Sequence, residues 1–159
     1  MTLLPDYPCV VVLVLSLFLH PPTASAQSCP CNTSSNYALL MDFYSTSTGW
    51  IHSNGWGDTS VPICSWWGDY YSIVDNGVAV VCNGTNIAGI KLQDNGITGT
   101  LPPSWSGMTQ LQWLDLYSNS LTGTLPPSWS NMTQLQGLYL DGNSLTGTLP
   151  PSWSSMTEP

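Results

Sequence analysis

The C-terminal half of the sequence repeats itself with a period of 24 residues. Residues 111–134 and 135–158 are identical at 18 of 24 positions, and residues 87–110 form a looser third copy. The copies keep one phase, which three kinds of residue mark: Asn95, Asn119 and Asn143, then Gly99, Gly123 and Gly147, then Trp105, Trp129 and Trp153. A unit this short cannot bury its apolar face alone, so the copies must stack on one another.

Each copy follows the pattern L-x-x-L-x-L-x-x-N-x-L, which is typical of leucine-rich repeats. We therefore predict an α/β solenoid, a short leucine-rich repeat of about three 24-residue coils with parallel strands on the concave side. The strands should centre on Leu92, Leu116 and Leu140. Each repeat Asn should turn its amide into the coil and bond to backbone groups of adjacent turns.

The apolar positions of the copies define the expected core. The inward-pointing strand residues are Ile90 and Leu92, Leu114 and Leu116, and Leu138 and Leu140. The repeat Trp residues should form a buried column rather than an aromatic stack for sugar, and Met108, Met132 and Met156 should fill the core. The Pro-Pro dipeptide of each TGTLPPSW segment should stay extended without ladder partners, because proline has no N–H to donate.

The two most similar copies differ at six positions, and four of these alternate with the inward residues of the strand. Alternate residues of a strand point to opposite faces, so these four should lie on the concave face. Aromatic and charged side chains there are typical of a recognition surface, and the alternative is a solvated sheet face with incidental aromatic residues. The candidate ligand-binding residues are Lys91, Gln93, Asp94, Trp113, Asp115, Tyr117, Tyr139 and Asp141.

Charge is scarce, and its sign excludes several functions. Only 6% of the 159 residues are charged, and Lys91 is the single Lys or Arg beside nine acidic residues, which gives a net charge of −8. Such a chain cannot neutralise several phosphates or dock through a basic patch, which excludes nucleic acid as a partner and argues against binding to anionic lipid. The sequence shows no phosphate loop and no metal-ligand cluster, so we expect neither a metal nor a cofactor.

Catalytic residues are not expected either. His52 lies in a predicted loop without a clear nucleophile partner. Asp115 and Asp141 could approach each other on the concave face, but nothing encloses them as acid–base chemistry requires. We therefore predict that the chain is not an enzyme.

Residues 1–26 are predicted to be a secretory signal peptide. An apolar run over residues 9–19 is too short to span a bilayer comfortably. Pro21 and Pro22 follow it, and residues 24–26 (Ala-Ser-Ala) offer a cleavage site. The alternatives are a short buried helix or an uncleaved anchor. No second apolar stretch follows, so we expect a secreted or extracellular-surface protein whose mature chain has no membrane-spanning segment.

Secretion favours disulfides, and four cysteines follow the signal peptide: Cys29, Cys31, Cys64 and Cys82. Cys64 and Cys82 bracket a hairpin turn predicted at residues 75–77 (Asp-Asn-Gly), so we expect these two to pair. The partners of Cys29 and Cys31 stay open. A zinc site of four thiolates is the competing hypothesis, and the absence of paired CxxC spacing argues against it.

A surface with so few charges needs another source of hydration. N-glycosylation sequons begin at Asn32, Asn83 and Asn131. Glycans at these positions would supply that hydration. The alternative is that some sequons are unoccupied, because a chain rich in Ser, Thr and Asn produces them by chance.

Residues 27–86 are expected to cap the first edge of the stack, because an uncovered edge would expose the core of the first coil. The segment 36–47 places Leu39, Leu40 and Phe43 at helical spacing, which predicts one helix. Its predicted N-cap is Ser34 or Ser35, and Trp50, Trp56, Trp66 and Trp67 follow in a predicted loop.

The repeat domain is predicted over residues 87–158 (87–110, 111–134 and 135–158) without a C-terminal cap, which leaves an edge for self-association.

Residues 36–158 resemble extracellular leucine-rich-repeat proteins. The residues that resemble the family's N-terminal cap are Ala38-Leu39-Leu40, Phe43-Tyr44, Trp56, Cys64-x-Trp66-Trp67-Gly68 and Val81-Cys82. The repeat motif TGTLPPSWSSM resembles the repeats of the trypanosomatid parasite surface antigens. This resemblance implies a surface or secreted glycoprotein, often lipid-anchored in that family, that acts in host contact and immune evasion. The chain has few repeats and no anchor signal or Cys-rich C-terminal cap, which indicates a truncated member.

We therefore predict a secreted or surface glycoprotein that recognises or adheres to an extracellular protein or glycan. One alternative is a structural or decoy coat glycoprotein without a specific ligand. Another, by analogy with other small extracellular repeat proteins, is an inhibitor of a secreted hydrolase.

Overall fold

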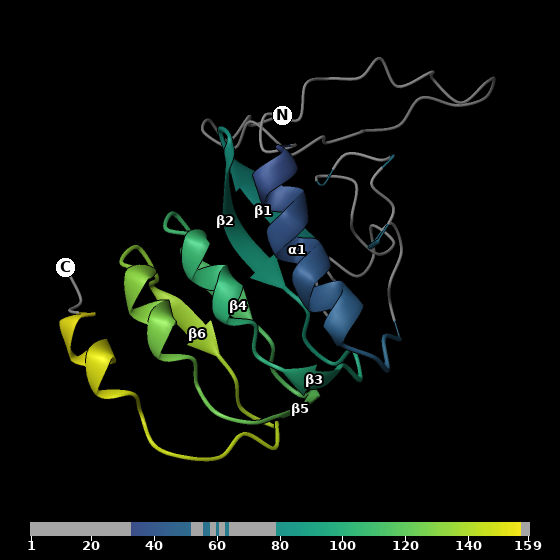
Figure 1. Ribbon diagram of the computed structural model, residues 1–159. Helices are drawn as coiled ribbons and strands as arrows, with labels where there is room; N and C mark the ends of the chain where they lie inside the picture. Colours follow the sequence, from purple (N-terminus) through teal and green to yellow (C-terminus); the bar gives the residue numbers. More distant parts are fainter. Residues whose placement is uncertain (1–32, 52–55, 58–59, 61–62, 64–78, 157–159) are drawn as a thin grey trace, which may run out of the picture.

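The computed structural model describes residues 33–51, 56, 57, 60, 63 and 79–156 (Figure 1). Several predictions from the sequence lie outside these residues: the signal peptide, the hairpin turn at residues 75–77, and the residues Cys29, Cys31, Asn32, His52, Cys64, Trp66 and Trp67.

The N-terminal part of the described chain is a single helix, α1 (Ser34–Thr46). The predicted N-cap is wrong by one or two positions, since Thr33 caps the helix and its side chain accepts a hydrogen bond from the Asn36 N–H. Thr33 can do so because its backbone is extended, whereas Ser34 and Ser35 already have helical geometry. Leu40 and Phe43 are fully buried as predicted, and they face the first repeat.

Four strands form the concave sheet in the order β1-β2-β4-β6. Strand β1 (Ala79–Asn83) pairs antiparallel with β2 (Asn86–Lys91). Strands β4 (Trp113–Asp115) and β6 (Gly137–Tyr139) continue the sheet in parallel, with partners 24 residues apart in register. The predicted solenoid with parallel concave strands is confirmed, and Figure 1 shows these strands following one another from α1 toward the C-terminus.

The predicted strand centres are wrong, because Leu92, Leu116 and Leu140 each directly follow a strand instead of lying at its middle. They nevertheless point inward, as the alternation predicted. The inward residues of the first two copies, Ile90, Leu92, Leu114 and Leu116, are at most 2% exposed, whereas Leu138 and Leu140 at the outer edge are partly buried.

The turn between β1 and β2 was not predicted as a hairpin. Asn83 and Asn86 are register partners, and Gly84 between them has a φ of +57°. This left-handed conformation explains the glycine, because other residues adopt it at a steric cost. Asn-Gly is the strongest short hairpin signal in a sequence, but here we interpreted it only as part of a sequon.

The return side of each coil also differs from the prediction. Strands β3 (Thr98–Thr100) and β5 (Ser120–Thr122) form a second, parallel sheet that was not predicted, whereas the prolines of the first copy, Pro102 and Pro103, lie outside both strands as expected. Three 3-10 helices then follow: η3 (Pro103–Gly107), η4 (Pro127–Asn131) and η5 (Pro151–Ser155). Only the first proline of each pair is extended, since the second opens the 3-10 helix, where its missing N–H costs nothing.

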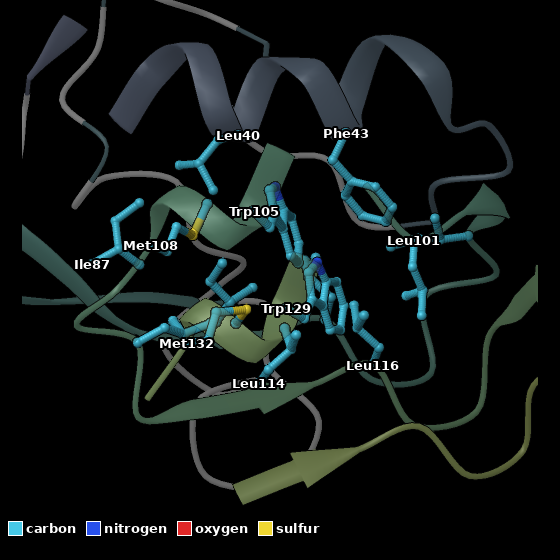
Figure 2. Packing of buried hydrophobic residues seen from close by; sticks show 14 of the residues in the cluster. Leu40, Phe43, Ile87, Leu101, Trp105, Met108, Leu114, Leu116, Trp129 and Met132 are labelled. Carbon is cyan, nitrogen blue, oxygen red and sulfur yellow. The ribbon is translucent and has the colours of Figure 1, made fainter. Parts of the chain in front are cut away.

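A column of parallel indoles runs through the core (Figure 2). The rings of Trp105 and Trp129 are 6.3 Å apart at 11°, and those of Trp129 and Trp153 are 6.3 Å apart at 9°. The first two are fully buried, which confirms the core interpretation for them, and Trp153 is partly buried. Each indole N–H donates to a carbonyl of the preceding element: Leu39 O for Trp105, Pro102 O for Trp129 and Pro126 O for Trp153.

A second column is made of buried asparagine side chains, as predicted. The Asn119 amide donates to Leu92 O at 2.8 Å in the preceding copy and to Leu116 O at 3.0 Å in its own copy. Its Oδ1 accepts the N–H groups of Asn95 and Ile97. Asn143 repeats the pattern one copy later, donating to Leu116 O and accepting from Leu121 N–H. These side chains satisfy backbone groups that curvature prevents from pairing in a ladder.

We expect Asn119→Ala to lower the free energy of unfolding by roughly 2–4 kcal/mol, because it leaves buried N–H and carbonyl groups without partners. Urea denaturation should show a lower midpoint at an unchanged slope. The matched control is Asn143→Ala, whose side chain is less buried and which should cost less, about 1 kcal/mol. Equal losses for the two variants would contradict the role given to Asn119.

Candidate functional site

The concave face is a grid of outward side chains that the parallel register fixes. One column runs across Gly89, Trp113 and Gly137, and the next across Lys91, Asp115 and Tyr139. Beyond the strands, the Asp94 N–H donates to Tyr117 O and the Ser118 N–H donates to Asp141 O, both at 2.9 Å. These bonds continue the ladder to a third column made of Gln93, Tyr117 and Asp141. The structure therefore brings seven of the eight candidate residues into these columns, and the eighth, Asp94, directly follows Gln93 with a φ of +50°.

Trp113 lies across the next coil instead of standing upright. A Cβ atom added to Gly137 would collide with the six-membered ring of the Trp113 indole and would lie 3.1 Å from Cε2 of Tyr139. Gly137 is buried, whereas Trp113 remains 48% exposed. Because residue 137 has no side chain, the Trp113 indole can lie directly over it, and the other side of the ring faces solvent.

Three large aromatic side chains are half exposed on this surface. Their exposed fractions are 48% for Trp113, 46% for Tyr117 and 47% for Tyr139. Rigid aromatic groups of this kind contribute large contact areas at low entropic cost when they bind a partner. Beneath them, Leu114 on β4 and Leu116 after it are fully buried, whereas Leu138 on β6 is partly buried.

A groove of about 590 Å³ lies between β1 and the aromatic side chains. Gly89 lies between its register partners Val81 and Trp113 and all three line the groove, while the Trp113 ring itself lies over Gly137. The polar groups around the groove are those of Asn83, Lys91, Gln112 and Asp115. A volume of this size is within the range of small-molecule and side-chain binding sites.

The charged residues of the site are spread along it. Lys91 and Asp115 are register partners that line the groove, whereas Asp141 ends the third column and Asp94 follows Gln93 at the start of that column. Asp115 aligns with Tyr139 and not with Asp141, and its Oδ1 accepts the Tyr117 N–H at 3.0 Å. This arrangement suits contact with a partner over an open surface, and it pairs no carboxylates for acid–base chemistry.

Sequence reasoning missed the contribution of β1 to the site. Val81 is 43% exposed and Asn83 is exposed, and both belong to the groove. The signal was present in the sequence, because an Asn-Gly turn at residues 83–84 predicts a hairpin that adds β1 to the concave sheet. Gln112 was missed because it precedes its strand.

The remaining predicted positions are partly described. Asn83 and Asn131 are both exposed, the latter at the end of η4. Cys82 is buried at 3% exposure and is disulfide-bonded, while Cys64 lies outside the described residues, so their pairing stays a prediction.

Within the described ranges, no cluster of three or more His, Cys, Asp or Glu side chains could hold a metal ion. No helix of the described chain is both long and apolar enough to cross a membrane.

Comparisons with known proteins agree with this architecture. The family model for the leucine rich repeat matches residues 85–145. No curated protein sequence matches the chain.

Among solved structures, the chain is similar to the ectodomain of the plant membrane receptor kinase GASSHO1/SCHENGEN3 from Arabidopsis thaliana in complex with CASPARIAN STRIP INTEGRITY FACTOR 2. The TM-score is 0.63 and the sequence identity 28%, over 76% of this chain and 14% of that chain. It is also similar to the BIR2 ectodomain from Arabidopsis thaliana, with a TM-score of 0.59 and 26% identity over 76% of this chain and 61% of that chain. The chain thus spans less than two thirds of either structure. It contains leucine-rich repeats and has the fold of plant leucine-rich-repeat ectodomains.

We expect Gly137→Ala to displace the Trp113 indole, because the added methyl group occupies the space of the ring. The indole N–H resonance of Trp113 should shift in two-dimensional NMR, with a stability loss below about 1 kcal/mol because the exposed ring can move outward. Gly107→Ala is the matched control, since a Cβ there meets only Leu39 side-chain atoms at 3.6 Å. An unshifted Trp113 resonance in the Gly137 variant would refute the position of the indole over residue 137.

Proposed function

We propose that this chain is a secreted or surface-exposed leucine-rich-repeat protein that recognises an extracellular protein or glycan through its concave face. The observation that carries the proposal is the exposure of three aromatic side chains on one rigid sheet, beside a groove. The proposed contact residues are Lys91, Gln93, Asp94, Trp113, Asp115, Tyr117, Tyr139 and Asp141.

The distribution of sequence differences between the last two copies supports this use of the face. Residues 113, 115 and 117, which lie in the three concave columns, differ from their equivalents 24 positions later, as does the adjacent residue 118. The buried Leu, Asn and Trp positions are the same in both copies. A scaffold kept constant beneath a varied surface is what a recognition module requires.

The structural relatives support ligand recognition in general terms. The GASSHO1/SCHENGEN3 ectodomain was solved in complex with a separate factor, CASPARIAN STRIP INTEGRITY FACTOR 2. Leucine-rich-repeat ectodomains are recognition proteins rather than enzymes, which favours a binding role for this chain. Adhesion and host–parasite contact rest only on the resemblance of the repeat motif to trypanosomatid surface antigens.

The remaining parts of the proposal follow from the sequence. Residues 1–26 serve as a signal peptide, residues 27–86 cap the stack with a Cys64–Cys82 disulfide, and residues 87–158 carry the repeats. N-glycans at Asn32, Asn83 and Asn131 hydrate a surface that has few charges.

Self-association at the outer edge of the third copy is a secondary proposal. Leu149 is 71% exposed there, and a hollow of about 500 Å³ is lined by Leu135, Leu138 and Trp153 among others. Exposed apolar surface of this kind favours contact with another protein surface.

The competing function is a coat glycoprotein without a specific ligand. It predicts no saturable binding, whereas the recognition proposal predicts binding that depends on the concave aromatic residues. Inhibition of a secreted hydrolase would appear as binding to an enzyme through the same residues.

We expect the triple variant Trp113→Ala, Tyr117→Ala, Tyr139→Ala to lose binding to host-cell and glycan panels, because it removes the exposed aromatic area. A loss of at least about 100-fold is expected, since hot-spot residues contribute on the order of 2 kcal/mol or more each. Surface plasmon resonance with the purified secreted protein gives the affinity.

The matched control removes an exposed apolar side chain that is not among the proposed contact residues, as Ile51→Ala, which is 65% exposed in the parent chain. This control should bind as the parent does. Unchanged binding by a folded triple variant would reject the concave face as the site.

A further inference from the structure

Asn83 combines two features: it begins a sequon, and it lies at the aromatic groove. Cys82 is buried, and its neighbours Val81 and Asn83 are exposed, so the latter two point to the concave side of β1. Val81 pairs with Gly89, and Gly89 pairs with Trp113. The side chain that would carry a glycan therefore projects on the face where the groove lies, and Asn83 is part of its lining.

The acceptor tripeptide is accessible to modification. Asn83, Gly84 and Thr85 are all exposed in the turn between β1 and β2. A Cβ atom added to Gly84 would meet no atom within 4 Å. The turn touches helix α1 through its backbone, where the Thr85 carbonyl accepts a hydrogen bond from the Asn36 amide at 3.0 Å. Exposed turns with an Asn-x-Thr sequence are where secreted chains carry N-glycans.

The chemistry of the groove suits a neutral sugar. Val81 and Trp113, the register partners of Gly89, offer apolar surface, and the outer face of the indole is open. The electron-rich face of an aromatic ring attracts the polarised C–H groups of a pyranose. Lys91 and Asp115 contribute opposite charges that cancel, and the amides of Asn83 and Gln112 can bond to sugar hydroxyl and N-acetyl groups.

The attachment point also fits the reach of a glycan core. Strand β1 is separated from β4 by β2, a distance of about 10 Å at two strand spacings. Asn83 also lies two residues beyond Val81, the register partner of Gly89, which adds an offset of about 7 Å along the strand. The Asn83 side chain and the two sugars of a chitobiose core together bridge this diagonal to the edge of Trp113 that lines the groove. Because the sugar is tethered, even a weak contact is populated through its high effective concentration.

We propose that the first sugars of an N-glycan on Asn83 fill this groove and pack against Trp113. The inference rests on the secretory location proposed above. With the groove occupied, the proposed contact residues that do not line it, such as Tyr117 and Asp141, are left for an external ligand.

The test uses the full chain secreted from eukaryotic cells, with the intact glycan, and NMR as the readout. Mass spectrometry of glycopeptides should show Asn83 occupied. The N-acetyl methyl resonances of the Asn83 core should lie upfield of their positions in the urea-unfolded glycoprotein, because the indole ring current shields them. This upfield shift should be lost in Trp113→Ala and retained in part in Trp113→Phe.

The reciprocal measurement follows the Trp113 indole N–H. It should shift in Thr85→Ala, which removes the Asn83 sequon, and stay unmoved in the matched control Thr133→Ala, which removes the sequon at Asn131 on η4. An unmodified Asn83, or an occupied Asn83 whose removal leaves the Trp113 resonance unmoved, would overturn the inference. Neither readout needs an external ligand, so a failure here is distinguishable from a failure of the recognition proposal.

Discussion

The structure depends on one recurring interaction, the hydrogen bonds by which a buried asparagine side chain joins two successive coils. Asn119 reaches back to Leu92 O and accepts from Ile97 N–H, and Asn143 does the same one copy later with Leu116 O and Leu121 N–H. A coil that changes direction between two sheets has backbone groups that no strand partner can reach. The asparagine amide, with two donors and an acceptor, satisfies them where water is excluded. Each coil therefore needs its neighbour in one fixed register.

The tryptophan column depends on that register and reinforces it. Trp129 donates its indole N–H to Pro102 O of the preceding coil, so the ring fills the core and also pairs a carbonyl at the start of η3. At the first edge, helix α1 replaces a coil: Leu39 O accepts from Trp105, and the Ser104 hydroxyl donates to Asp42. The helix thus mimics the hydrogen-bonding edge of a repeat, and its Phe43 ring packs edge-on against Trp105 at 4.8 Å.

Much of this could be predicted from the sequence because the 24-residue period fixes which residues become neighbours. Inward leucines, buried asparagines and the concave residues all follow from phase and alternation alone. The orientation of the Trp113 indole could not be predicted. The period places Gly137 beside Trp113 but does not give the rotamer that lays the indole over Gly137. The 3-10 helices were missed because proline lacks a ladder donor both in extended chain and at a helix start. The β1 side of the groove was missed because Asn83-Gly84 serves as sequon and turn at once.

The proposed recognition function depends on the same columns, since they hold together the coils that carry the concave side chains. The most direct test of this account is native-state amide hydrogen exchange. The N–H groups of Ile97 and Leu121 have asparagine Oδ1 atoms as acceptors, whereas the Gln112 N–H bonds to the strand carbonyl Ala88 O. The account predicts that Ile97 and Leu121 exchange as slowly as Gln112, because opening any of them requires separating two coils. Exchange of Ile97 and Leu121 at the rate of the exposed turn amide of Gly84 would contradict it.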